Sequence, residues 1–136
     1  MKIVASLLFL ALGTLGHTEE VLYCVEKEGS IVTPDKTRTG FAMQTRTYKI
    51  SDAIYLANSD CPVGPESPSY RDICAYELRE KPGLIVGEKN QPCGYEILVF
   101  LRKVSPLGQI YYEFTRTDVC SYQTIATAGT CEIFGK

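Results

Sequence analysis

Few residues of this 136-residue chain could perform catalysis, and the single histidine, His17, comes first among them. A serine or cysteine hydrolase activates its nucleophile with a neighbouring base, normally a histidine. A histidine at a mature N-terminus could bind copper through its amine and ring, but a stable site of that kind normally recruits a second histidine. We therefore expect His17 to belong to a disordered terminus. We also expect no catalytic histidine, no metal ion and no cofactor.

Carboxylates are the next candidates, because two acids that face each other across a sugar can hydrolyse a glycosidic bond. Four acids are spread over the C-terminal half of the chain: Glu77, Glu96, Glu113 and Asp118. Nothing in the sequence sets the separation that this reaction needs. A hydrolase that uses Glu96 and a second acid stays open as an alternative.

The chain has nine tyrosines and no tryptophan. Tyr111, Tyr112 and Tyr122 fall on neighbouring predicted strands, where they could form a stacking platform for bases or for a partner protein. Ordinary cross-strand packing explains the same tyrosines equally well.

Six cysteines follow the N-terminal segment, with no CxxC pair and no histidine partners for zinc. In a small exported chain an even number of cysteines indicates disulfides. We expect Cys24 to pair with Cys131, which ties the two ends of the chain together, and leave the other pairings open. The six are Cys24, Cys61, Cys74, Cys93, Cys120 and Cys131.

Residues 1–16, "MKIVASLLFLALGTLG", combine one lysine, an apolar run and small residues, as a secretory signal peptide does. The apolar run is too short to span a bilayer. We expect cleavage after Gly16, or else after Gly13, and a secreted, soluble single domain over 17–136 with no membrane partner. With 14 basic and 16 acidic residues the chain has no overall basic character, so RNA binding would need a local patch.

The spacing of apolar residues predicts a helix over 48–60, "YKISDAIYLANSD", because Ile50, Ala53, Ile54 and Ala57 fall on one helical face. A helix this short needs a sheet to pack against. Residues 59–72 contain three prolines and a glycine, which indicates a long loop.

Strand patterns dominate after residue 82. "PGLIVG" is a short apolar run, and "CGYEILVFLRK" is apolar on both faces, which favours a central strand. "SPLG" predicts a turn, "QIYYEFTRT" a further strand, and "SYQTIAT" and "TCEIF" two more. Near the start, "EVLYCVEKEGSIVT" suggests a hairpin closed around Lys27 to Gly29. We therefore predict an α+β domain with one helix packed on an antiparallel sheet.

This order of elements resembles the small secreted guanyl-specific ribonucleases of fungi. "ISDAIYLA" is similar to their "SD(I/V)xxA" helix, "GYEIL" at 94–98 to their "YYE(F/W)P" strand, and "YYEFTRTDVCSYQTIATAGTC" at 111–131 to their C-terminal part. The resemblance implies a ribonuclease-like fold with a disulfide that joins the chain ends.

The family's catalytic set is not retained. Its glutamate falls on Glu96, but its histidine falls on Thr127, which cannot act as a general acid near neutral pH. Its arginine falls near Tyr111, and Arg116 has the opposite strand parity to Tyr111. The resemblance therefore implies a ribonuclease-like pseudoenzyme.

Plant-pathogenic fungi such as powdery mildews secrete ribonuclease-like proteins of this kind as effectors, and "LYC" at 22–24 is similar to the aromatic-cysteine start of these effectors. The resemblance implies a virulence protein that binds a host protein, such as an immune receptor, or host RNA, with delivery into host cells as an option. The expected binding face has the 62–70 loop as its rim and contains Tyr95, Glu96, Tyr111, Arg116 and Tyr122. The alternatives are the active hydrolase on Glu96 and a disulfide-rich β-sandwich that acts as an inhibitor or toxin.

Overall fold

The computed structural model describes residues 19–39, 44–57 and 60–134. Strands account for most of these residues, and there is one short helix, α1 (Tyr70–Cys74). The strands are β1 (Glu20–Val32), β2 (Thr37–Thr39), β3 (Thr45–Ile50), β4 (Ile54–Leu56), β5 (Ala75–Lys81), β6 (Leu84–Gln91), β7 (Gly94–Val104), β8 (Ile110–Cys120) and β9 (Gln123–Ile133).

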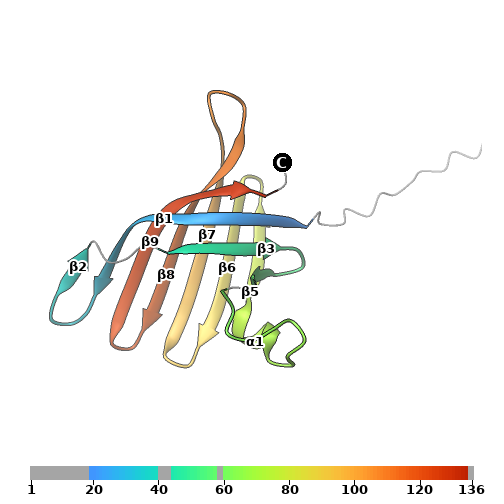
Figure 1. Ribbon diagram of the computed structural model, residues 1–136. Coiled ribbons are helices and arrows are strands. Elements are labelled where there is room, and N and C mark those ends of the chain that lie inside the picture. Colours follow the sequence, from blue (N-terminus) through green and yellow to red (C-terminus); the bar gives the residue numbers. More distant parts are fainter. Residues whose placement is uncertain (1–18, 40–43, 58–59, 135–136) are drawn as a thin grey trace, which may run out of the picture.

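The strands form a closed antiparallel barrel (Figure 1). From β3 to β9 each strand pairs with the next in the chain, and β1 pairs with both β3 and β9, which closes a ring of eight strands. β2 pairs only with the last residues of β1 and adds a short ninth strand outside the ring. Closure leaves the eight ring strands without a free edge within the described residues.

The predicted α+β fold is wrong, because the helix predicted at 48–60 does not form. These residues belong to β3 and β4, which are joined by a turn and pair so that Ile50 lies opposite Ile54. Two inward-facing residues of a tight hairpin can thus lie four positions apart, the same spacing as on one face of a helix. α1 lies further along the chain, and within residues 19–39, 44–57 and 60–134 no helix covers a sheet. The barrel also differs from the β-sandwich that we considered as an alternative.

Predictions for the other strands were more accurate. β6, β7 and β8 occupy the predicted apolar segments, and β7 is central, between β6 and β8. The "SPLG" turn forms, with Gly108 at a φ of 79°. The predicted hairpin around Lys27 to Gly29 is wrong: β1 runs straight through these residues, and a bulge between Glu26 and Glu28 interrupts its pairing with β9. The two predicted C-terminal strands form one strand, β9.

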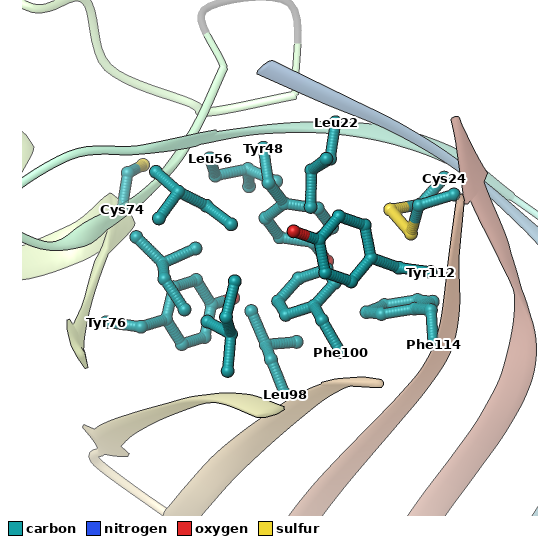
Figure 2. Close-up of a cluster of buried hydrophobic side chains, with 14 of the residues drawn as sticks. Leu22, Cys24, Tyr48, Leu56, Cys74, Tyr76, Leu98, Phe100, Tyr112 and Phe114 are labelled. Carbon is teal, nitrogen blue, oxygen red and sulfur yellow. A yellow bond between two sulfur atoms is a disulfide. The ribbon is translucent and has the colours of Figure 1, made fainter. Parts of the chain in front are cut away.

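Side chains along each strand alternate between the barrel interior and the outside. In β7, Leu98 and Phe100 are buried inside, whereas Tyr95 and Leu101 are exposed. The interior aromatic rings pack together: Tyr48 lies 5.6 Å from Phe100, centroid to centroid, and Phe114 lies 5.2 Å from Phe100. Figure 2 shows these rings surrounded by aliphatic residues from the facing strands. This part of the interior is filled by side chains, as in other small barrels.

Three disulfides reinforce the barrel. Cys24 pairs with Cys131 across the β1–β9 closure, which confirms that prediction. Cys61 pairs with Cys74 and fastens the 62–70 loop to α1, and Cys93 pairs with Cys120 at the β6–β7 turn. Disulfides are typical of proteins exported to an oxidising compartment. The predicted signal peptide and His17 lie outside the described residues.

In the part of the chain that the structure describes, no helix has the length and apolar character needed to cross a membrane.

Candidate binding cavity at the polar end of the barrel

The barrel interior changes character along its axis. The rings of Figure 2 fill one part, while charged side chains gather at the end where β6 and β8 finish and β7 begins. α1 and the β6–β7 and β8–β9 turns lie at this same end (Figure 1). We call it the polar end. The inward alternation of five strands, β1, β3, β6, β7 and β8, places the charged residues here: Glu26, Arg46, Lys89, Glu96, Arg116 and Asp118.

Glu26 and Arg116 form a buried ion pair. Nε of Arg116 donates a hydrogen bond to Oε1 of Glu26 at 2.9 Å, and the two side chains are only 6% and 1% exposed. Oε2 of Glu26 also accepts from the backbone N–H of Gln44 at 3.4 Å. The pair links β1 and β8 through the interior, because β9 lies between these two strands in the ring.

Glu96 is the second buried carboxylate, and it accepts two hydrogen bonds from side chains. The Tyr76 hydroxyl donates to Oε1 at 2.8 Å, and Nε2 of Gln91 donates to Oε2 at 2.9 Å. Nζ of Lys89 lies 3.8 Å from Oε2 and supplies the opposite charge. Burial and the Glu96 charge raise the pKa of Tyr76 well above its ordinary value, so this hydroxyl stays protonated and remains a donor.

The ammonium group of Lys89 makes three contacts. Besides facing Glu96, its ammonium donates to the backbone carbonyl of Ile73 at 2.9 Å and lies 4.6 Å from the centre of the Tyr76 ring. The contact with Ile73 ties α1 to the wall of the barrel.

A cavity of about 500 Å³ opens at the polar end, above these pairs. Arg46 and Asp118 both line it, from β3 and β8 respectively. Its apolar lining comes from Leu56 and from the exposed residues Pro62, Ile73 and Pro92. Larger hollows of about 730 to 780 Å³ lie over other elements, but neither buried ion pair lines them.

Two buried hydroxyls near this region lack a hydrogen-bond partner among the described residues, those of Tyr48 and Thr127. Thr127 lies opposite Arg116 in the β8–β9 register. Burial raises the pKa of Tyr48 above its ordinary range, and the neighbouring charge of Arg46 opposes that shift. Neither residue lines this cavity, and Thr127 instead lines the hollow over β1, β8 and β9.

The structure brings only two of the five predicted binding residues together. Glu96 and Arg116 lie inside the barrel and line the cavity. Tyr95 points outward and is 45% exposed, and Tyr122 lies in the β8–β9 turn. Tyr111 lies near the start of β8, at the opposite end of this strand from the turn that holds Tyr122. The three tyrosines therefore form no single platform.

Other predicted features have mixed positions. The 62–70 loop contributes Pro62 to the rim of the cavity. Tyr112 is buried in the core and donates to Glu20 at 3.1 Å. Glu77 and Glu113 are exposed on the outside, whereas Asp118 lies opposite Glu96 in the β7–β8 register.

Sequence reasoning missed Glu26, Arg46 and Lys89. A usable signal was present, since Glu26 has the same strand parity as the buried Leu22 and Cys24, and Arg46 has that of Tyr48. A charge at an inward-facing position of a strand marks a buried polar group. No group of three or more histidine, cysteine, aspartate or glutamate side chains among the described residues is arranged to hold a metal ion.

No protein-family model, no curated protein and no solved structure gives a significant match to this chain.

Proposed function

We propose that this protein is an exported binding protein that holds a small polar molecule in the cavity at the polar end of its barrel. An eight-stranded barrel is just wide enough to be filled by side chains or to hold one small ligand. Here packing fills one part of the interior, and a cavity of about 500 Å³ remains in the other. This volume lies in the range of small-molecule sites.

The observation that carries the proposal is the concentration of charge beneath this opening. Glu26, Glu96 and Arg116 are each no more than 5% exposed. Stability alone does not call for buried ion pairs, because well-packed apolar residues of similar volume usually serve as well or better. Buried charges together with a small number of convergent polar groups at the mouth of a cavity are instead typical of ligand sites.

A screen of a small-molecule library by ligand-observed NMR or native mass spectrometry tests the proposal. Pro92 is exposed in the β6–β7 turn and lines the cavity, so Pro92→Trp places a large ring at its mouth and should abolish binding. Glu77→Trp is the control, because Glu77 is exposed on β5 and does not line the cavity. Failure of every compound to bind the wild-type protein, or equal binding by the Pro92→Trp variant, would contradict the proposal.

One observation favours a second candidate function, a hydrolase built on two acids. Glu96 and Asp118 lie opposite each other in register, and both line the cavity. Glu96 is already held by Tyr76, Gln91 and Lys89, which disfavours a role as a mobile acid. Incubation of purified protein with RNA and with glycan substrates decides this point: turnover that Glu96→Gln abolishes would support the hydrolase.

The role of a fungal effector that binds a host protein or host RNA rests on the sequence motifs alone. The helix-on-sheet fold that those motifs implied is absent. If the half-buried Tyr111 and the exposed Tyr122 bind such a partner, Tyr111→Ala and Tyr122→Ala should act independently, because Tyr111 lies near the start of β8 and Tyr122 in the turn after its end. Titration of RNA into each variant measures this.

A further inference from the structure

Two charged residues of opposite sign line the cavity without an ion-pair partner. Arg46 donates from Nη2 to the side-chain oxygen of Gln44 at 2.9 Å, but no carboxylate of a described residue lies close enough to form a salt bridge with it. Glu96 and Glu26 act on its charge only at longer range. Asp118 has no salt bridge within the described residues either. Its Oδ1 lies 3.9 Å from Sγ of Cys120, and a disulfide sulfur has no proton to donate.

The other buried charges are already matched. Glu26 is paired with Arg116, and Glu96 is paired with Lys89 and accepts two further hydrogen bonds. The cavity is also lined by Asp72, which is exposed on α1 and therefore accessible to water. Arg46 and Asp118 are thus the two half-buried charged residues of the cavity lining that have no ion-pair partner among the described residues. Both are available to bind a ligand.

Both residues line the same cavity of about 500 Å³, so one ligand in it can lie against both. Arg46 lies on β3 and Asp118 on β8, and in the ring β1 and β9 separate these strands. Each charge has lost part of its hydration without gaining an opposite charge at ion-pair distance among the described residues, which is unfavourable. A carboxylate on the ligand would match the planar guanidinium of Arg46 with two parallel hydrogen bonds. An ammonium group on the same ligand would match Asp118.

Part of the remaining lining is apolar. Leu56, Pro62, Ile73 and Pro92 border the cavity beside polar residues such as Asn90 and Gln91, and its volume exceeds what two small ionic groups would fill. Apolar walls with a few convergent charges are the usual composition of a small-molecule site.

We infer that the cavity binds a zwitterionic ligand, such as an amino acid with a large apolar side chain: its carboxylate binds Arg46, its ammonium group binds Asp118, and its apolar part packs against Leu56, Pro62, Ile73 and Pro92. This inference rests on the proposed binding function. A purely anionic ligand would leave Asp118 unmatched, and a purely cationic ligand would leave Arg46 unmatched.

Three probes that share one ring test the inference on the wild-type protein: L-phenylalanine, which carries both charges, phenethylamine, which carries only the ammonium, and 3-phenylpropionate, which carries only the carboxylate. Calorimetry or NMR titration at neutral pH measures the three affinities. The Kd of phenylalanine should be lower than that of either analogue by about tenfold or more. If an analogue binds as tightly as phenylalanine, or if phenylalanine does not bind, the inference is wrong.

Two variants assign the charges. Arg46→Met should weaken phenylalanine binding to the level of phenethylamine, and Asp118→Asn should weaken it to the level of 3-phenylpropionate. Each variant should leave the affinity for the analogue that lacks the corresponding charge unchanged. If a variant binds phenylalanine as tightly as the wild-type protein does, the assignment of that residue is wrong.

The library screen separates this inference from the proposed function. If neutral compounds bind in the cavity while phenylalanine does not, the cavity is a binding site and only the zwitterion inference fails. If nothing binds, the proposed function fails as well. The comparison of the three probes needs no variant, so it holds even if a substitution prevents folding.

Discussion

Arg116 and Glu26 meet inside the barrel through a 2.9 Å hydrogen bond, although 90 positions of sequence separate them. One residue lies on β8 and the other on β1, and β9 lies between these strands, so the pair spans the closure of the ring. It therefore links the closure of the barrel to the electrostatics of its polar end. Both side chains have lost nearly all contact with water, so each charge is compensated mainly by the other.

Removal of one partner of this pair should be strongly destabilising. We expect Arg116→Met to lower the free energy of unfolding by about 3 to 5 kcal/mol, because it leaves the Glu26 carboxylate buried and unpaired. The double variant with Glu26→Gln should recover part of this loss. Urea unfolding followed by circular dichroism measures both.

The exposed pair of Lys103 and Glu113, with Nζ and Oε2 3.9 Å apart, supplies the control. Lys103→Met should change the free energy of unfolding by less than about 1 kcal/mol, since solvated ion pairs contribute little. Equal effects of Arg116→Met and Lys103→Met would mean that burial does not determine the strength of the inner pair.

The tyrosines Tyr48 and Tyr76 offer a matched comparison of one deleted oxygen. Both rings are buried, but only the Tyr76 hydroxyl donates a short hydrogen bond, to the Glu96 carboxylate, whereas the Tyr48 hydroxyl interacts with the nearby Arg46 side chain. We expect Tyr76→Phe to cost about 1.5 to 3 kcal/mol, the range for a hydrogen bond to a charged group. Tyr48→Phe should cost less than Tyr76→Phe, because the Tyr48 hydroxyl makes no short hydrogen bond to a carboxylate. Unfolding curves in urea test this order, and the reverse order would contradict it.

Much of the strand pattern could be predicted from sequence, because burial on the two faces of a strand leaves a local signature. β7 and β8 are long, alternate clearly and follow each other across a short turn, so each could be recognised within its own segment. The hairpin of β3 and β4 was mistaken for a helix because Ile50 and Ile54 face the same core in either structure. Periodicity alone does not separate these two cases over so few residues.

The closure of the barrel has no such local signature. It depends on the pairing of β1 with β9, for example of Leu22 with Ile133. The expected Cys24–Cys131 disulfide brings these two segments together, but a disulfide does not by itself specify that two strands pair. The candidate site is equally hard to predict, because its residues lie on strands that only the closed ring brings together. Glu96 could be proposed from its own motif, whereas Glu26, Arg46 and Lys89 become neighbours of the cavity only once the ring is closed.

The stability of the protein should decrease at alkaline pH as tyrosines ionise. Burial and the nearby Glu20 carboxylate raise the pKa of Tyr112 to about 12, against about 10 in an unfolded chain. A raised pKa means that the folded state retains its proton while the unfolded state releases it. The contribution of Tyr112 is therefore complete below about pH 10 and is lost as the pH rises towards 12.

Urea unfolding at several values between pH 8 and pH 11.5 measures this loss, and absorbance of tyrosinate reports the ionisation. Above pH 10, the free energy of unfolding should fall less steeply with pH in Tyr112→Phe than in the wild-type protein. The difference in slope should correspond to at most one proton released on unfolding. Tyr48 and Tyr76, whose pKa values burial also raises, should contribute to the slope that remains, as should Tyr55. An unchanged slope in Tyr112→Phe would contradict the assignment.

The disulfides should differ in their contribution to stability according to the length of chain that they enclose. Cys24 and Cys131 are 107 positions apart, whereas Cys61 and Cys74 are 13 apart. Loss of the first, as Cys24→Ala with Cys131→Ala, should cost about 4 to 5 kcal/mol, and loss of the second about 3 kcal/mol, if restriction of the unfolded chain dominates. Thermal unfolding of the two double variants compares them.

The Cys61 and Cys74 variant should in addition loosen α1 at the cavity and weaken ligand binding, while the Cys24 and Cys131 variant should alter binding only to the extent that the protein unfolds. A larger loss of stability from the short loop would show that local packing, and not chain closure, sets the contribution of each disulfide.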